Sequence, residues 1–167
     1  MPTDNPKLTP RIPVTGLWDA ALEAFLAHFR DALADTEYAD IRPTHGCVFR
    51  FLRDDGMRLT RLAELASITK QSAGEIVDDL AQRGYVERIP DPEDKRAKLI
   101  TLTEKGREAQ ATGFALFAGI EREWIDRYGA KRWNAMRELL EEIVAAEAPD
   151  AVPELARQEL ADLAPAA

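Results

Sequence analysis

Residues 57–107 constrain the fold of this chain more than any other segment, because short helical and strand-like patterns alternate there with turn residues. A first helix is expected to open at Thr60, after which Ser67 to Thr69 turn the chain. The inward-facing residues of this helix are Leu62, Leu65 and Ala66. Thr69 is a suitable N-cap for a second helix, so the spacing predicts a helix-turn-helix.

The second helix and the segment after it complete the pattern. Residues 70–83 form the helix, and Gly84 suits a left-handed C-terminal cap. Its inward stripe consists of Ala73, Ile76, Val77 and Leu80. Residues 85–88 and 98–102 have strand-like composition, and the charged loop 91–96 between them contains proline. We therefore expect a hairpin with a long loop, which forms a wing.

Three motifs, in this order and at these separations, resemble the winged helix-turn-helix of the MarR family of bacterial transcriptional regulators. They are the run 59–66, the run 84–88, and the run 94–96 that continues to Leu102-Thr103-Glu104-Lys105-Gly106. The resemblance covers roughly residues 15 to 147. It implies a mainly α fold with a small β-hairpin wing, and N- and C-terminal dimerisation helices around the DNA-binding unit.

The expected organisation divides the chain into five parts. They are a flexible N-terminal arm (1–14), an N-terminal dimerisation helix (15–40), a winged helix-turn-helix DNA-binding region (41–107), C-terminal dimerisation helices (108–147) and a C-terminal tail (148–167). The tail is rich in Ala, Glu and Pro, and no function is assigned to it.

Apolar stripes at helical spacing flank the predicted DNA-binding region. The first stripe contains Trp18, Leu22, Phe25, Phe29 and Leu33. A second helix, capped by Thr103 and ended by Gly129, carries Phe114, Phe117, Ile120, Trp124 and Tyr128, and a third carries Trp133, Met136, Leu140, Ile143 and Val144. These stripes form either an ordinary monomeric core or an interface between two subunits. The family resemblance favours the homodimer.

Composition narrows the class of protein further. The chain has 167 residues, of which 46% are hydrophobic and 31% charged, as in ordinary globular proteins. No membrane span or signal peptide is visible, so a cytoplasmic protein without membrane contact is expected. The single cysteine, Cys47, excludes an intramolecular disulfide and a Cys-based zinc cage. We expect no cofactor, no metal site and no catalytic residues.

The net charge of −8 requires that any DNA-binding surface be local. Residues 57–107 hold ten Lys or Arg against nine Asp or Glu, whereas residues 1–56 hold six against nine and residues 108–167 hold six against twelve. The winged segment is therefore the least acidic part of the chain. Counterion release needs only a local set of cations that face phosphate, so acidic flanks do not forbid specific binding.

The N-terminal residues of the second helix are the candidates for base contacts, because a recognition helix presents this end to the major groove. They are Thr69, Lys70, Gln71, Ser72 and Gly74. Gln71 suits a bidentate pair with adenine, and Lys70 suits guanine or phosphate. Thr69 has an alternative role as a helix cap only. Gly74 is unusual inside a helix and is interpreted as allowing close approach to DNA.

Acidic residues on the same helix depart from the family pattern. The helix is expected to expose Glu75, Asp78 and Asp79, whereas many family members carry basic residues at the positions of Glu75 and Asp79. A carboxylate near the DNA backbone is repelled more often than not. We therefore expect weak non-specific binding.

In the wing, the family resemblance implies that Arg96 reaches the minor groove and that Asp94 holds it or a neighbouring basic residue in place. The candidate phosphate partners are Arg88, Lys95 and Lys98. The alternative interpretation is a solvated charged hairpin.

The resemblance also implies a small aromatic or anionic ligand between the dimer helices and the DNA-binding region. Residues that are candidates for lining such a crevice are Trp18, Phe25, His45, Phe49 and Arg50, although aromatic residues at helical spacing are more often plain core. Redox sensing through Cys47 is an alternative. The apolar neighbours Val48 and Phe49 indicate a buried thiol, which argues against it.

Two further alternatives concern the class of protein. An enzyme would have to use His45 and Cys47, but residues two apart on a helix point to opposite sides. A winged helix used only for protein contacts remains open, because the recognition helix is acidic. The sequence as a whole favours a homodimeric regulator, typically a ligand-responsive repressor, on a palindromic double-stranded DNA site.

Overall fold

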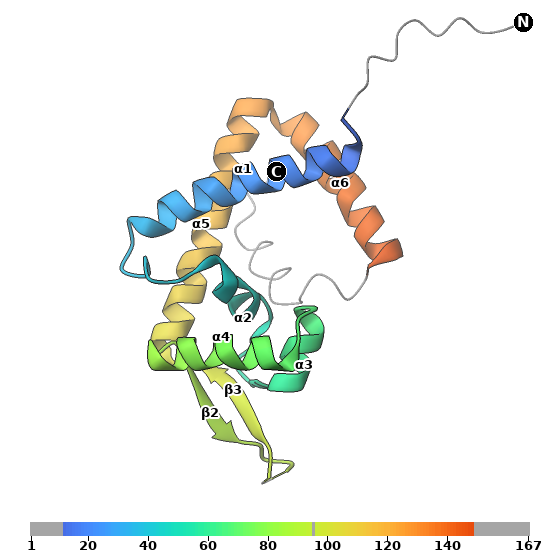
Figure 1. The fold of residues 1–167 in the computed structure, drawn as a ribbon. Helices are drawn as coiled ribbons and strands as arrows, with labels where there is room; N and C mark the ends of the chain where they lie inside the picture. Colours follow the sequence, from blue (N-terminus) through green and yellow to red (C-terminus); the bar gives the residue numbers. More distant parts are fainter. Residues whose placement is uncertain (1–11, 95, 149–167) are drawn as a thin grey trace, which may run out of the picture.

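The computed structural model describes residues 12–94 and 96–148 (Figure 1). The helices and strands are, in chain order, α1 (Val14–Ala34), the 3-10 turn η1 (Pro43–His45), α2 (Gly46–Phe51), β1 (Met57–Arg58), α3 (Leu59–Leu65), α4 (Lys70–Gln82), β2 (Val86–Pro90), β3 (Lys98–Leu102), α5 (Glu104–Tyr128) and α6 (Ala130–Glu147). The expected mainly α fold with a β-hairpin wing is confirmed. In Figure 1, α5 runs from the end that holds the sheet to the end that holds α1 and α6.

The helix-turn-helix forms as the sequence predicts, with small shifts. Helix α3 begins at Leu59, one residue before the expected start. Its Leu62 and Ala63 are buried, whereas the apolar residues at its C-terminal end are only half-buried. Thr69 caps α4, because its Oγ1 accepts a hydrogen bond from the Ser72 N–H at 3.1 Å. The inward stripe of α4 is confirmed, since Ala73, Val77 and Leu80 are buried and Ile76 is half-buried.

The sheet contains one strand more than the sequence predicts. Its order is β1-β3-β2, all antiparallel, and Arg88 on β2 lies opposite Ile100 on β3. Gly84 precedes β2 with φ of 79°, the left-handed conformation expected of a helix end. Strand β1 has only two residues, too few to show a period in the sequence.

Gly106, the last residue of the third motif, is required by close packing. A Cβ atom on Gly106 would lie 2.0 Å from the Tyr85 carbonyl oxygen, so any larger residue would push α5 away from the start of β2. Thr103 fixes the same junction, because its Oγ1 accepts from the Gly106 N–H at 3.1 Å and donates to the Gly84 carbonyl at 2.6 Å. The sequence predicted Thr103 as a helix cap, and this is confirmed.

One hydrophobic core lies inside the helix-turn-helix and its sheet. Its most deeply buried side chains include Leu52, Leu62, Leu80, Tyr85, Ile100 and Leu102. Leu33, the last residue of the α1 stripe, belongs to this core together with Tyr38 in the following turn, and Phe29 packs against it. The core therefore joins the end of α1 to the predicted DNA-binding region.

The helical frame, which we define as α1, α6 and the C-terminal half of α5, is held by aromatic contacts. Phe29 stacks on Phe117 with ring centroids 4.3 Å apart, and Trp124 packs edge-on against Phe25. Trp124 also meets Trp133 of α6 at a right angle. Helix α1 thus packs on α5, and α6 folds back on it after Gly129, where the sequence predicts the helix end.

The N-terminal helix is shorter than the expected segment 15–40. It ends at Ala34, and residues 35–40 form turns. The cause is local, because the Thr36 Oγ1 donates a hydrogen bond to the Leu33 carbonyl at 2.7 Å and competes with helix continuation. Most of the predicted N-terminal arm and nearly all of the tail lie outside the described residues. Among the helices that are described, none is long and apolar enough to cross a membrane.

Candidate nucleic-acid interface

The N-terminus of α4 presents the predicted base-reading side chains together. Lys70 and Gln71 are exposed, and the Gln71 Nε2 donates to the Glu75 Oε1 at 3.1 Å. The Thr69 hydroxyl is bound within the helix end, where it contacts the Ser72 N–H and the Ser72 hydroxyl at 2.8 Å. Both interpretations of Thr69 remain compatible with this position, although its capping role is now observed.

Gly74 is not explained by packing inside the chain. A Cβ atom there would lie 3.8 Å from the Leu59 side chain, which is ordinary van der Waals contact. Among the described residues nothing requires glycine at this position. Close approach to DNA therefore stays a prediction.

The acidic residues of α4 are placed differently from the sequence expectation. Asp79 is not an exposed groove residue, because its side chain is 28% exposed and turns toward η1 and Arg83. Asp78 pairs with the Arg88 Nη1 at 2.5 Å. The expectation that Asp79 is exposed is therefore wrong, since its carboxylate is partly buried and pairs with cations of the chain itself.

Arg88 is already engaged in an ion pair, whereas the sequence suggested a cation available to contact phosphate. Its pairing with Asp78 links β2 to the exposed side of α4, and its side chain is 34% exposed. To contact phosphate, Arg88 would have to leave this ion pair or share it. Its role as a phosphate partner remains a prediction.

The base of the wing is organised by Asp91, which the sequence analysis did not single out. This carboxylate is buried, and its Oδ2 accepts from the Arg58 Nε at 2.7 Å and from the Arg58 Nη2 at 2.6 Å. Its Oδ1 accepts from the Glu93 N–H at 2.9 Å. The bonds from the Glu93 N–H and from Arg58 hold the pKa of Asp91 below its usual value. The Asp-Pro step was the sequence signal for this turn.

The tip of the wing carries the side chain that the family resemblance favours. Asp94 does hold Arg96, but through the backbone, because the Asp94 Oδ1 accepts from the Arg96 N–H at 3.0 Å. The Arg96 side chain is exposed, and so is Lys98 at the start of β3. Lys95 lies outside the described residues. The wing loop is thus fixed by its two aspartates while it presents basic side chains.

The five residues proposed for a ligand crevice lie in different surroundings. Trp18 is exposed on the N-terminal half of α1, and Phe25 packs among the rings of α5. Phe49 packs edge-on against Tyr85 in the core, and Arg50 lies over the Phe51 ring. His45, the last residue of η1, is buried. The crevice stays a prediction.

His45 and Cys47 have separate structural roles. The His45 Nδ1 accepts from the Arg42 N–H at 3.1 Å, so its Nε2 carries the proton and donates to the Asp79 Oδ2 at 2.9 Å. The Cys47 Sγ donates to the Thr44 carbonyl at 3.2 Å, and burial raises the pKa of this thiol. A raised pKa lowers the thiolate population, which counts against both a nucleophile and a redox sensor.

Comparisons with known proteins agree with the fold. The sequence model of the MarR family matches residues 39–97. The HTH-type transcriptional regulator YybA of Bacillus subtilis is 26% identical over 86 residues, which are 50% of this chain and 57% of YybA. The chain therefore spans little more than half the length of this relative.

Solved structures extend the likeness beyond the matched segment. The crystal structure of transcriptional regulator PA4135 is 26% identical, with a TM-score of 0.65, over 82% of this chain and 99% of that chain. CouR from Rhodococcus jostii RHA1, solved with bound p-coumaroyl-CoA, is 25% identical, with a TM-score of 0.63, over 78% of this chain and 91% of that chain. The predicted family resemblance is confirmed.

A shorter likeness to an enzyme concerns only a part of that enzyme. A riboflavin kinase of Thermoplasma volcanium is 39% identical over 56 residues, which are 34% of this chain and 24% of the kinase. The likenesses that extend over most of a known chain are to transcriptional regulators, in agreement with the expected non-enzymatic regulator.

Proposed function

Because the winged helix-turn-helix of this chain belongs to the MarR family, we propose that the protein binds a specific double-stranded DNA site as a homodimer and represses transcription. One observation carries the proposal: the exposed N-terminus of α4 and the exposed Arg96 belong to the same winged helix-turn-helix. Lys70 and Gln71 would enter the major groove while Arg96 reaches the adjacent minor groove. The two contacts together specify one register on the duplex.

The homodimer is supported by the apolar surface of the helical frame. Large apolar side chains are exposed on the N-terminal half of α1 and along α6: Val14, Leu17, Trp18, Leu22, Met136, Leu139, Leu140 and Ile143. Monomeric proteins rarely expose so many large apolar residues in neighbouring elements. We propose that a second copy of the chain covers them and that two-fold symmetry produces a palindromic site.

A small-molecule response is part of the proposal. CouR is a structural relative that was solved with p-coumaroyl-CoA, which combines an aromatic group with anionic phosphates. We propose that a ligand of aromatic or anionic character binds this protein where the frame meets the DNA-binding region. Trp18, Phe25, His45, Phe49 and Arg50 are the proposed contacts, once the partner subunit has completed the crevice.

The experiment is selection of bound duplexes from a random DNA pool at stated salt, run in parallel with the Arg96→Ala protein. Loss of a minor-groove arginine is expected to lower affinity for the selected site by about tenfold or more. The matched control is Arg30→Ala, which removes the same charge from an exposed ion pair on α1. The Arg30→Ala protein should bind as the wild type does.

The outcomes separate the proposed function from its alternatives. An inverted repeat with half-sites about 10 bp apart supports the dimeric regulator. Enrichment without inverted symmetry contradicts the dimer. No enrichment favours a winged helix that makes protein contacts only, and equal binding by Arg96→Ala excludes the proposed role of the wing.

A further inference from the structure

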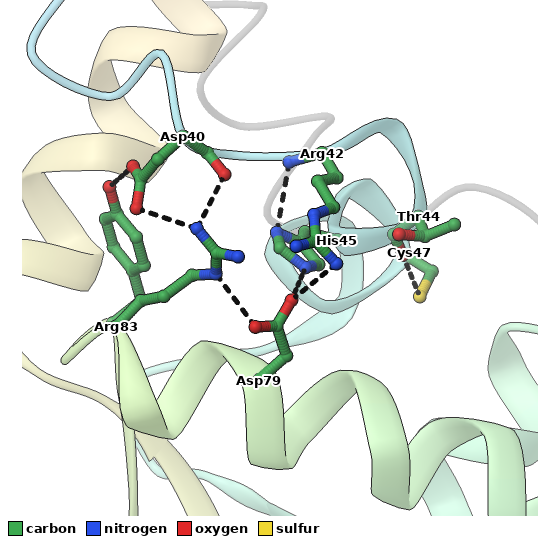
Figure 2. A network of polar contacts seen from close by, with 8 residues as sticks. Asp40, Arg42, Thr44, His45, Cys47, Asp79 and Arg83 are labelled. Atoms are coloured by element: carbon green, nitrogen blue, oxygen red, sulfur yellow. Dashed lines mark hydrogen bonds and ion pairs between the residues drawn. The ribbon is translucent and has the colours of Figure 1, made fainter.

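Asp79 lies at the centre of a polar network that joins the recognition helix to another part of the chain (Figure 2). Its Oδ1 accepts from the Arg83 Nε at 2.9 Å, and its Oδ2 accepts from the His45 Nε2 at 2.9 Å. The Arg42 Nη1 lies 3.2 Å from the same Oδ2. Both carboxylate oxygens are therefore occupied, and two of the three donors come from the segment that precedes α2.

Arg83 extends the network one turn further along α4. Its Nη1 lies 3.2 Å from both the carbonyl oxygen and the Oδ2 of Asp40. The other carboxylate oxygen of Asp40 accepts from the Tyr85 hydroxyl at 2.6 Å. The guanidinium is thus held between two carboxylates, one on the recognition helix and one on the connection from α1. Figure 2 shows Arg83 between Asp40 and Asp79.

The segment whose side chains bond to Asp79 and Arg83 is in turn connected to α1. We call residues 40–45 the linker strap. The Ile41 N–H donates to the Tyr38 carbonyl at 3.0 Å, and Tyr38 lies in the same hydrophobic core as Leu33, near the end of α1. The strap is therefore joined to the core that holds the end of α1, and it is also bonded to α4.

We propose that Asp79 is a positioning residue for DNA recognition, which holds the C-terminal half of α4 to the linker strap so that the recognition helix follows the position of α1. This inference rests on the proposed function. It supplies a route by which dimerisation or a ligand at α1 changes the angle of the helix in the groove. Coupling of this kind can be carried by a chain of hydrogen bonds and ion pairs, and the network provides one.

The hydrophobic contacts of α4 do not depend on this link. Val77 and Leu80 are fully buried and hold the helix to the core. Asp79 is partly exposed, and its charge-assisted bonds fix direction more than they contribute to stability. Loss of the carboxylate charge should therefore allow the helix to pivot without unfolding.

The sign of the effect on DNA binding distinguishes positioning from simple electrostatics. Removal of a negative charge from a recognition helix strengthens binding to any duplex, because phosphate repulsion falls. If Asp79 positions the helix, Asp79→Asn should instead lower the ratio of operator to random-duplex affinity by about tenfold. Asp78→Asn is the matched control, because it removes the same charge one residue earlier and its partner is Arg88.

A second variant tests the other end of the link. Asp40 lies on the linker strap and not on the recognition helix. Asp40→Asn should lower the same ratio, and its effect should not add to that of Asp79→Asn, because both break one chain of contacts. Amide exchange of α4 should rise in both variants and stay unchanged in Asp78→Asn, at a temperature well below all melting midpoints.

The outcomes are separable from those of the proposed function. A wild type without operator preference contradicts the proposed function, and the positioning role falls with it. If the wild type prefers its operator and both Asp79→Asn and Asp40→Asn are as selective as the wild type, only the positioning role is overturned. Equal losses in all three variants would also overturn it, because they indicate a general charge effect.

Discussion

The DNA-binding region and the helical frame bury their apolar residues to very different extents. In the DNA-binding region, Leu62, Val77 and Leu80 have no exposed surface. In the frame, α6 has no buried residue at all, and Leu139 is 56% exposed. Both regions have apolar stripes of similar helical spacing. The same sequence pattern thus marks a finished core in one region and an open surface in the other.

The difference indicates which part of the chain folds on its own contacts. The helix-turn-helix, the three-stranded sheet and the start of α5 enclose one cluster within a single subunit. In the frame, large apolar side chains of α1 and α6 stay exposed in the single chain. We infer that the DNA-binding region is stable at any protein concentration and that the frame depends on a partner.

The largest expected effect is the difference in the free energy of unfolding when the same substitution is made in each of the two regions. Leu80→Ala removes a fully buried side chain and should lower the free energy of unfolding by about 2–5 kcal/mol. Leu139→Ala should lower it by less than about 0.5 kcal/mol in dilute protein, where the chain is monomeric. Denaturant unfolding monitored by circular dichroism measures both values.

Protein concentration provides the control for this comparison. The effect of Leu139→Ala should grow as concentration rises, because the side chain becomes buried when two copies associate. The effect of Leu80→Ala should not change. If Leu139→Ala is as costly as Leu80→Ala in dilute protein, the distinction between the two regions is wrong.

A smaller effect concerns a carboxylate in each region. Asp91→Asn weakens the bonds to Arg58 and to the turn amides, so the wing should lose its fixed shape and operator affinity should fall by about tenfold. Glu121→Gln in the frame weakens the acceptor of the hydrogen bond from the Trp133 Nε1. This substitution should leave the affinity for operator DNA unchanged. Fluorescence anisotropy with labelled operator measures both affinities.

Epistasis tests whether Asp91 acts through the wing. In an Arg96→Ala background, Asp91→Asn should have little further effect, because the side chain that the wing presents is already absent. Additive losses would show that Asp91 acts by another route.

The smallest effect is the pH dependence of the linker strap. Burial lowers the pKa of His45 below its ordinary value, and this outweighs the opposing effect of the hydrogen bond that the ring donates to Asp79. The folded state therefore favours the neutral ring, which accepts the Arg42 N–H and faces the cations Arg42 and Arg83. Its contribution to stability is complete above about pH 6.5 and is lost as the pH falls through the lower pKa of the folded state.

Thermal melting at about pH 7 and about pH 5.5 measures this dependence. The melting midpoint of the wild type should fall with acidification by more than that of His45→Gln, which cannot gain the proton. His28→Gln is the matched control in the frame, where His28 accepts from the Trp124 Nε1 at 3.4 Å. Its melting should follow the wild type. Identical pH dependence in His45→Gln would mean that other groups control acid stability.

Local signals in the sequence were sufficient for the elements of the DNA-binding region. Thr69, Gly84 and Thr103 mark helix ends because capping and left-handed conformation depend on a few adjacent residues. The same local chemistry predicted the exposed charged wing. Strand β1 and the end of α1 were missed, since two residues show no period and the competing Thr36 bond is a single contact.

The candidate site was predicted only in part, because ion pairs join residues that are distant in the sequence. Arg58 and Asp91 are 33 positions apart, and His45 and Asp79 are 34 apart. Neither pair leaves a periodic or adjacent pattern. The sequence therefore placed Asp79 on the exposed side of α4, whereas folding brings it to the linker strap.

The sequence by itself determined the order of helices and strands, their caps and the family resemblance, because each of these depends on neighbouring residues and their periodicity. Only the tertiary structure decided which charges face outward. Asp78 and Asp79 are adjacent and chemically identical, yet one pairs with β2 and the other with η1. Successive residues on a helix point in directions about 100° apart, and what each side chain meets depends on elements that pack there from elsewhere in the chain.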